Sequence, residues 1–300
     1  MKSKEQFKSE LMLILVTLIW GGTFPVIKAG LSDISPLLMV VVRFFLAFLF
    51  FLPVIIKKRI LLTKGIIKAG LILGFFTFIG YGMMTIGLTM TTVAKSSLIS
   101  YGYALVTPIL QFLLLKKKVS PINLIGLVIA FTGMLIFTSP SAAGWNMGDS
   151  ITVLVALGYA FTVVLLDKYS RIYDVEVLTG IQFFFTAVFS VMLIPFFETP
   201  VFIPTVNLFI ALFYLVIPGT VGALYLMNRY QKGTTPVRAV VIYALEPVIA
   251  IILGYFFLAE YIGWQELMGG VIILAGVLFS EVWGLFVTPK SKTTSLESKV

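Results

Sequence analysis

The chain has 300 residues, of which 59% are hydrophobic and 12% are charged, and its mean hydropathy is +1.07. A soluble domain of this length needs far more polar surface, so the composition indicates an integral membrane protein. The chain contains neither cysteine nor histidine, which excludes disulfides, thiol nucleophiles, haem ligation by His and zinc sites built from these residues. We therefore expect no metal and no cofactor.

Apolar runs that each approach the length needed to cross a bilayer follow one another along the whole chain. They predict an all-α protein with ten membrane-spanning helices, near residues 11–31, 36–56, 66–90, 93–115, 121–138, 149–167, 175–197, 205–228, 236–258 and 264–286. The first run lacks a small-residue cleavage site and is interpreted as a retained span. The polar tail, residues 288–300, is expected to be disordered in the cytoplasm.

Positive charges support this count of spans. With the N-terminus inside, 19 of the 22 Lys and Arg residues fall in segments on the inner side, and the others are Lys28, Arg43 and Lys95. The positive-inside rule then predicts a multi-pass protein of the cell (inner) membrane with both termini in the cytoplasm. The net charge of +9 is thus interpreted as a topology signal, and no nucleic-acid partner is expected.

The two halves of the chain resemble each other. WGGTFPVI (20–27) aligns with YAFTVVLL (159–166) at an offset of 139, and TTVAKSSLISYGYAL (91–105) aligns with GTTPVRAVVIYALEP (233–247) at an offset of 142. We predict two repeats of five helices, residues 1–138 and 149–287. Because five is odd, the second repeat enters the membrane from the opposite side, which is typical of transporters with a substrate site between the repeats.

Two motifs resemble a known family. WGGTFPVIKAG (20–30), followed by Arg43, and LEPVIAIILGYFFLAE (245–260) are similar to segments of EamA-type proteins of the drug/metabolite transporter superfamily. The resemblance covers about residues 11 to 287. It implies ten helices in two repeats, a central cavity, and export or exchange of small metabolites, often coupled to a cation gradient. The halves differ where the first has Ala104-Leu105 and the second has Glu246-Pro247.

The first span concentrates residues that are unusual in a lipid-facing helix. Gly21, Gly22 and Pro25 allow either close helix packing or a kinked helix beside a cavity, and both interpretations stay open. Trp20, Thr23 and Phe24 lie among them and become candidate cavity residues.

Two ionisable residues lie inside predicted spans. Glu246 lies near mid-depth of the ninth span, where a carboxyl group must be paired, hydrated or protonated, so it can carry a proton or bind a substrate amine. Leaving Arg43 unpaired in the second span would cost roughly 2.5–3.5 kcal/mol. We favour a structural tie near the outer surface for Arg43, with a site for an anionic substrate group as the alternative.

Tyrosines complete the predicted substrate pathway. Tyr243 shares a helix face with Glu246, and with its repeat partner Tyr101 and with Tyr81, Tyr103 and Tyr159 it could line an amphipathic cavity. The candidate site comprises Trp20, Thr23, Phe24, Tyr81, Tyr101, Tyr159, Thr162, Tyr243 and Glu246, with Arg43 as candidate charge partner. Lys95 and Arg238 are interpreted as anchors near opposite membrane faces.

These features favour a secondary transporter, an exporter or exchanger of small metabolites such as amino acids, working by alternating access with proton or cation coupling. The alternative is a multidrug or organic-cation exporter, and the position of Arg43 relative to the cavity discriminates between them. A membrane-embedded enzyme is less favoured, because the chain has no His or Cys and the spans hold no aspartate pair. The chain also has no GxxxxGK[ST] loop, so ATP-driven transport within this chain is not supported. A receptor or assembly factor would need a sizeable loop or tail domain.

Overall fold

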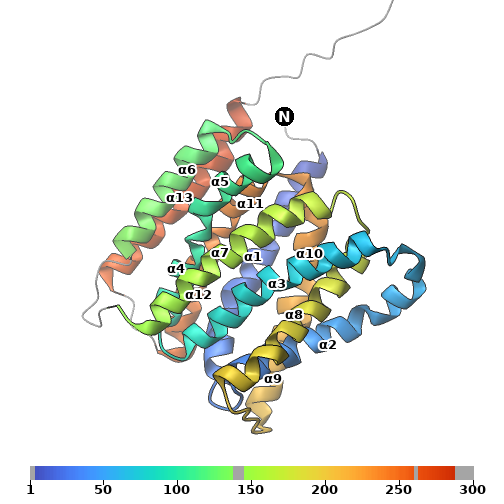
Figure 1. The fold of residues 1–300 in the computed structure, drawn as a ribbon. Helices are drawn as coiled ribbons and strands as arrows, with labels where there is room; N and C mark the ends of the chain where they lie inside the picture. The colour runs from blue at the N-terminus through green and yellow to red at the C-terminus, as the bar shows by residue number, and fades with distance from the viewer. Residues whose placement is uncertain (1–3, 138–144, 260–262, 288–300) are drawn as a thin grey trace, which may run out of the picture.

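The computed structural model describes residues 4–137, 145–259 and 263–287, and these residues are built almost entirely from helices (Figure 1). Within the described residues, strand pairing is limited to one isolated antiparallel bridge between Ile34 and Phe202. The predicted all-α class is therefore confirmed. The predicted disordered tail lies outside the described residues.

The helices follow one another through short connections. The first half contains α1 (Lys4–Gly30), α2 (Pro36–Lys57), the 3-10 turn η1 (Arg59–Leu61), α3 (Lys64–Leu88), α4 (Val93–Tyr101), α5 (Tyr103–Leu115) and α6 (Pro121–Phe137). The second contains α7 (Met147–Tyr169), α8 (Val175–Phe197), α9 (Val206–Val216), the π turn η2 (Ile217–Gly222), α10 (Ala223–Tyr230), the 3-10 turn η3 (Gln231–Gly233), α11 (Pro236–Tyr243), α12 (Leu245–Leu258) and α13 (Trp264–Val287).

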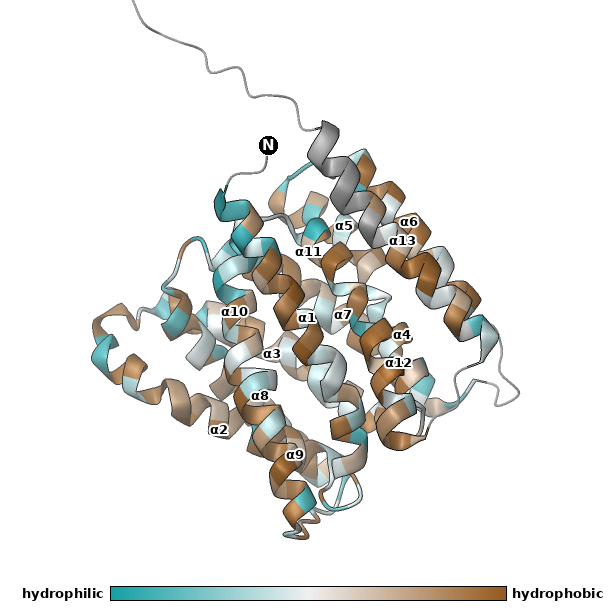
Figure 2. Ribbon diagram, turned by 180° about the vertical axis from the view of Figure 1, so that it is seen from behind, coloured by the Kyte–Doolittle hydropathy of each residue, from teal (hydrophilic) through white to brown (hydrophobic). Residues whose placement is uncertain are grey.

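Most of these helices suit a bilayer. Eight segments of the described chain are long and apolar enough to span it, and the apolar side of the hydropathy scale dominates the ribbon in Figure 2. The two other predicted spans fall on α6 and α13, whose described apolar stretches, Pro121–Ile136 and Leu267–Gly276, are shorter. The chain is thus a multi-pass membrane protein, and the count of ten spans stays a prediction.

Three predicted spans are interrupted inside the protein. The run 93–115 breaks between α4 and α5 at Gly102, and the run 236–258 breaks between α11 and α12 at Ala244. Pro247 has no N–H to donate to the carbonyl of Tyr243, the last residue of α11, whereas Pro108 lies inside α5, six residues after the break at Gly102. In the run 205–228, Pro218 lies in η2, a π turn of a kind that is frequent at functional sites.

The first helix of each half packs into the other half. Helix α1 lies against α12, α10 and α9, whereas α7 lies against α3, α5 and α4. Helices α6 and α13 pack together at one edge, and α2 packs against α8 on the opposite side of the molecule (Figure 1). Gly21 allows the contact between α1 and α12, because a Cβ there would lie 2.5 Å from Ile249 Cγ2. The centre of the bundle is consequently formed by both halves.

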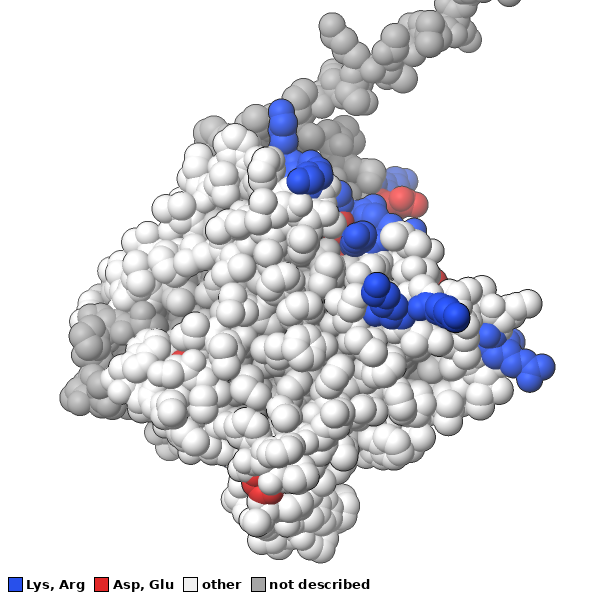
Figure 3. All heavy atoms as spheres, in the orientation of Figure 1, with Lys and Arg blue, Asp and Glu red and all other residues white. Residues whose placement is uncertain are grey.

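Charged side chains gather at helix ends. On the face shown in Figure 3, the Lys and Arg residues cluster along one edge, the side of the molecule that carries the N-terminus. Ion pairs tie neighbouring helices there: Lys58 contacts Asp174 and Glu176 at 2.8 and 2.7 Å, and Asp167 pairs with Lys117 and Arg171. This asymmetry is the pattern expected when one end of a membrane protein faces the cytoplasm.

Candidate functional site

A small cavity lies where the two halves meet. Its volume is about 30 Å³, and it is enclosed by α1, α3, α5, α7, α10, α11 and α12. The lining residues are Trp20, Thr23, Tyr81, Tyr103, Tyr159, Thr162, Val163, Leu224, Met227, Tyr243 and Glu246. Metabolite sites are usually about 300–1,000 Å³, whereas this space has room for about one or two water molecules. The helices must therefore separate before a solute can bind here.

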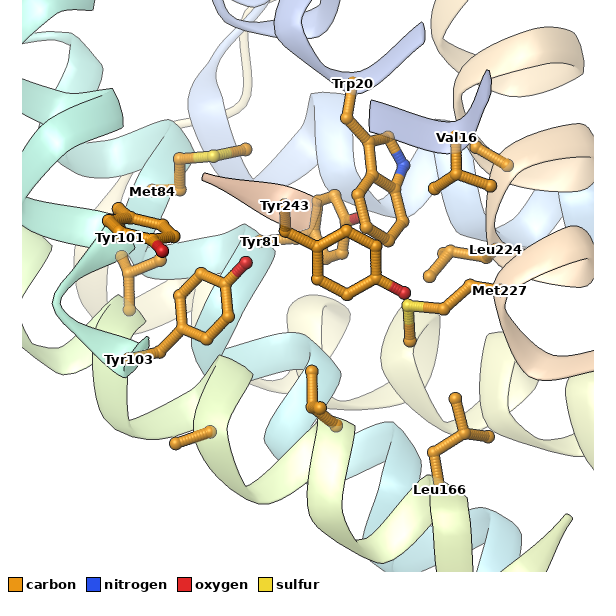
Figure 4. Close-up of a cluster of buried hydrophobic side chains, with 14 of the residues drawn as sticks. Val16, Trp20, Tyr81, Met84, Tyr101, Tyr103, Leu166, Leu224, Met227 and Tyr243 are labelled. Atoms are coloured by element: carbon orange, nitrogen blue, oxygen red, sulfur yellow. The ribbon is translucent and has the colours of Figure 1, made fainter. Parts of the chain in front are cut away.

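Five of the eleven residues that line the cavity are aromatic. Figure 4 shows Trp20, Tyr81, Tyr103 and Tyr243 gathered around one region between the helices. The rings of Trp20 and Tyr243 are 5.7 Å apart, and Tyr159 contacts Tyr81 at 5.5 Å and Tyr103 at 5.8 Å, both edge to face. Tyrosine combines an apolar face with a hydroxyl, so the wall suits a solute that has both apolar and polar parts.

Glu246 is the acidic residue of the cavity. It lies in the first turn of α12, deep within the bundle, and its side chain is half-buried with its accessible part facing the cavity. Within the part of the chain that the structure describes, no side chain donates a hydrogen bond to its carboxylate. The carboxylate is placed to accept hydrogen bonds from a solute or from water.

Arg43 lies one layer behind the cavity wall. The side chain is 2% exposed, its Nε donates to Thr220 Oγ1 at 2.5 Å, and its Nη2 donates to the Gly219 carbonyl at 3.1 Å. The guanidinium lies 4.7 Å from the ring centre of Tyr81, a cation–π contact. No carboxylate among the described residues forms an ion pair with it. Arg43 thus links helix α2 to the turn η2 inside the protein, and its position near the outer membrane surface stays a prediction.

The π turn η2 supplies the partners of Arg43. A π turn lengthens the hydrogen-bonded ring, and Pro218 donates no N–H, so carbonyl groups in this segment are available to other donors. The Gly219 carbonyl accepts from Arg43 and also from Trp20 Nε1 at 3.1 Å. The turn therefore joins the buried cation to a ring that lines the cavity.

The structure brings seven of the predicted site residues together at the cavity: Trp20, Thr23, Tyr81, Tyr159, Thr162, Tyr243 and Glu246. Phe24 does not line it, because it lies about 100° further round α1 than Thr23 and packs in the core. Tyr101 does not line it either, because α4 ends at this residue and its hydroxyl donates to the Val240 carbonyl at 3.3 Å.

Three apolar residues of the wall are absent from the sequence prediction: Val163, Leu224 and Met227. Nothing in an apolar span distinguishes such residues from those that face lipid.

The structure also explains the glycines of α1 and shows where Pro25 lies. Gly21 and Gly22 allow close contact with Ile249 and with the hydroxyl of Tyr214, whereas Pro25 lies in an apolar groove between α1, α9 and α12.

Comparison with known proteins settles the family. The sequence model of the EamA-like transporter family matches residues 7–139 and again residues 146–281. The chain belongs to the EamA-like transporter family. The resemblance seen in WGGTFPVIKAG and in the Leu-Glu-Pro segment is thus confirmed, and the protein is a transmembrane transporter.

Relatives of this EamA-like transporter cover most of its length. It is 33% identical over 272 residues to an uncharacterized transporter of Archaeoglobus fulgidus, an alignment that spans 90% of this chain and 84% of that one. It is 26% identical over 241 residues to an S-adenosylmethionine uptake transporter of Rickettsia bellii, covering 79% and 80% of the two chains. A solved crystal structure with 17% sequence identity superposes with a TM-score of 0.75 over 93% of this chain, which shows a shared fold.

Proposed function

We propose that this chain is a secondary transporter of small metabolites such as amino acids or related solutes, operating as an exporter or exchanger by alternating access. The single observation that carries the proposal is the position of Glu246, which faces a tyrosine-lined cavity at the centre of a membrane protein. Among the described residues, no side chain donates a hydrogen bond to its carboxylate. Intramembrane acids are rare and usually functional. Glu246 binds a solute amine or carries a coupling proton.

The proposed mechanism uses two inverted five-helix repeats with both termini in the cytoplasm. The double match to one family model supports the repeats, and the clustering of Lys and Arg residues at the end near the N-terminus supports the orientation. Repeats of opposite orientation allow inward-open and outward-open shapes of similar energy. Because the cavity of about 30 Å³ is too small for a solute, this conformation corresponds to the closed stage between them.

A multidrug or organic-cation exporter is the second candidate. The lining includes Glu246 but leaves out Arg43, so the fixed charge at the cavity surface is negative when Glu246 is ionised. That arrangement favours a solute with an amine or another cationic group over an anion. The relative named as an S-adenosylmethionine uptake transporter adds that compound, and uptake as a direction, to the candidates worth testing.

The test is solute flux through the purified chain in lipid vesicles. A panel of amino acids, amines, lipophilic cations and S-adenosylmethionine is loaded on one side, and counterflow of the labelled solute is measured against protein-free vesicles. We expect saturable exchange for one cationic or zwitterionic class. Absence of flux for the whole panel, in vesicles shown to contain folded protein, would contradict the proposal.

A further inference from the structure

Two ion pairs with buried carboxylates lie at opposite ends of α1. Arg238 Nε lies 2.7 Å from Glu10 Oε1, and Lys95 Nζ lies 3.3 Å from Asp149 Oδ2; the acidic side chains are 5% and 0% exposed. Lys28, near the end of α1, donates to the Thr91 carbonyl at 2.7 Å, which brings this end close to Asp149. At 1.5 Å per residue, Glu10 and Lys28 are roughly 27 Å apart, about the thickness of a bilayer core.

The two pairs occupy corresponding positions in the two halves of the chain. Glu10 and Asp149 are 139 positions apart, the same offset that aligns WGGTFPVI with YAFTVVLL. Lys95 and Arg238 are each the third residue of an interrupted helix, after the capping residues Thr92 and Thr235. They are 143 positions apart, one more than the offset that aligns Tyr101 with Tyr243. Each pair therefore joins the first helix of one half to the interrupted fourth span of the other half.

The basic partners lie on short helices that reach the cavity. Helix α11 carries Arg238 in its first turn and ends at Tyr243 in the cavity wall. Helix α4 carries Lys95 in its first turn and ends at Tyr101, which bonds the Val240 carbonyl of α11. Because the chain breaks at Gly102 and at Ala244, each short helix can tilt as a unit. Release of either pair would then change the cavity wall.

We propose that Arg238–Glu10 and Lys95–Asp149 are the two gate contacts of the transport cycle, one closing the cavity toward each membrane face. The proposal rests on the inverted-repeat transporter described above. Both pairs are formed here and the cavity is nearly closed, as expected of a stage in which neither face has access. Opening toward one face separates the pair at that face, where water hydrates the two charges and lowers the cost of separating them.

The natural absence of cysteine makes this proposal directly testable. A Thr162→Cys reporter places one thiol in the cavity wall, and a membrane-impermeant maleimide is added to right-side-out or inverted membrane vesicles. Arg238→Gln should raise the labelling rate about fivefold from the cytoplasmic face, and Lys95→Gln should do so from the outer face. The conservative variants Arg238→Lys and Lys95→Arg should restore the original rates.

Lys58→Gln is the matched control, because it removes the two ion pairs that link the end of α2 to the start of α8 and does not alter an interrupted helix. If Arg238→Gln does not insert, Glu10→Gln tests the same pair. The proposal is overturned if both variants act on the same face, or if neither differs from the control. Labelling needs no substrate, so the two proposals can fail separately. If the vesicles show solute flux but the variants do not change labelling from one face, only the gate proposal is contradicted. If labelling changes as expected but no solute is transported, only the proposed function is contradicted.

Discussion

At the residue scale, the account depends on the carboxylate of Glu246. Replacing Glu246 by Gln keeps the shape of the side chain but removes its charge, so the bond to a solute amine loses its ionic component. A charge-assisted hydrogen bond is worth about 1.5–3 kcal/mol, so we expect apparent affinity to fall about 10- to 100-fold. Counterflow in vesicles measures this change. Glu5→Gln, at an exposed position in the first turn of α1, is the control, and equal effects of both variants would remove Glu246 from the site.

The buried hydrogen bond between Arg43 and Thr220 gives a second prediction at the residue scale. Thr220→Val removes the hydroxyl that accepts from Arg43 Nε and leaves a buried charged donor short of a partner. We expect the protein to lose about 1–3 kcal/mol of stability, measured by thermal unfolding in detergent. Thr17→Val is the control, because the Thr17 hydroxyl bonds only to the Leu13 carbonyl of its own helix among the described residues. An unchanged transition for Thr220→Val would show that this bond contributes no stability.

At the element scale, the contact between α1 and α12 positions Glu246. A Cβ on Gly21 would lie 2.5 Å from Ile249 Cγ2 and 3.2 Å from the Glu246 carbonyl, so Gly21→Ala must push the two helices apart. Overpacking of this kind costs about 1–3 kcal/mol, and we expect both a lower unfolding temperature and slower transport. Gly270→Ala in α13 meets no atom within 4 Å and should change neither. Equal behaviour of the two variants would contradict the close contact.

The start of α8 gives a pH-dependent prediction. Partial burial opposes ionisation of Asp174, but the hydrogen bonds from Lys58 and from the backbone of Val177 and Glu176 outweigh it and hold the pKa of Asp174 below its ordinary value. A carboxyl group with a lowered pKa stabilises the fold above the unfolded pKa of about 4 and loses that contribution as pH falls through its folded pKa.

Asp174→Asn keeps an N-cap residue for α8 but removes the charge. At neutral pH we expect a loss of about 0.2–1 kcal/mol, the range of solvent-exposed ion pairs, and a smaller loss at high salt. As pH falls below about 4 the difference from the natural chain should shrink, and it should vanish below the folded pKa of Asp174. Unfolding curves across pH test this, and a difference that stays constant down to pH 3 would show that the charge does not act through ionisation.

At the scale of the whole molecule, the sequence predicts what depends on hydrophobic length and charge. It predicts the helical membrane class, because transfer free energies act on every span in the same way. The motifs in residues 20–30 and 245–260 predict the family. The sequence does not predict the partners of Arg43, because Gly219 and Thr220 lie in a π turn far along the chain. Nor does it distinguish Tyr103, which lines the cavity, from Tyr101, which does not, because the break at Gly102 separates them.

The central claim is that one cavity between two oppositely oriented halves is reached in turn from both membrane faces. The most direct measurement is labelling of the single thiol in Thr162→Cys, in an otherwise unaltered chain, by an impermeant maleimide added to one face at a time. The account predicts labelling from each face in separate experiments, slowed from both faces by a transported solute. Labelling from only one face under every condition, or from neither, would contradict it.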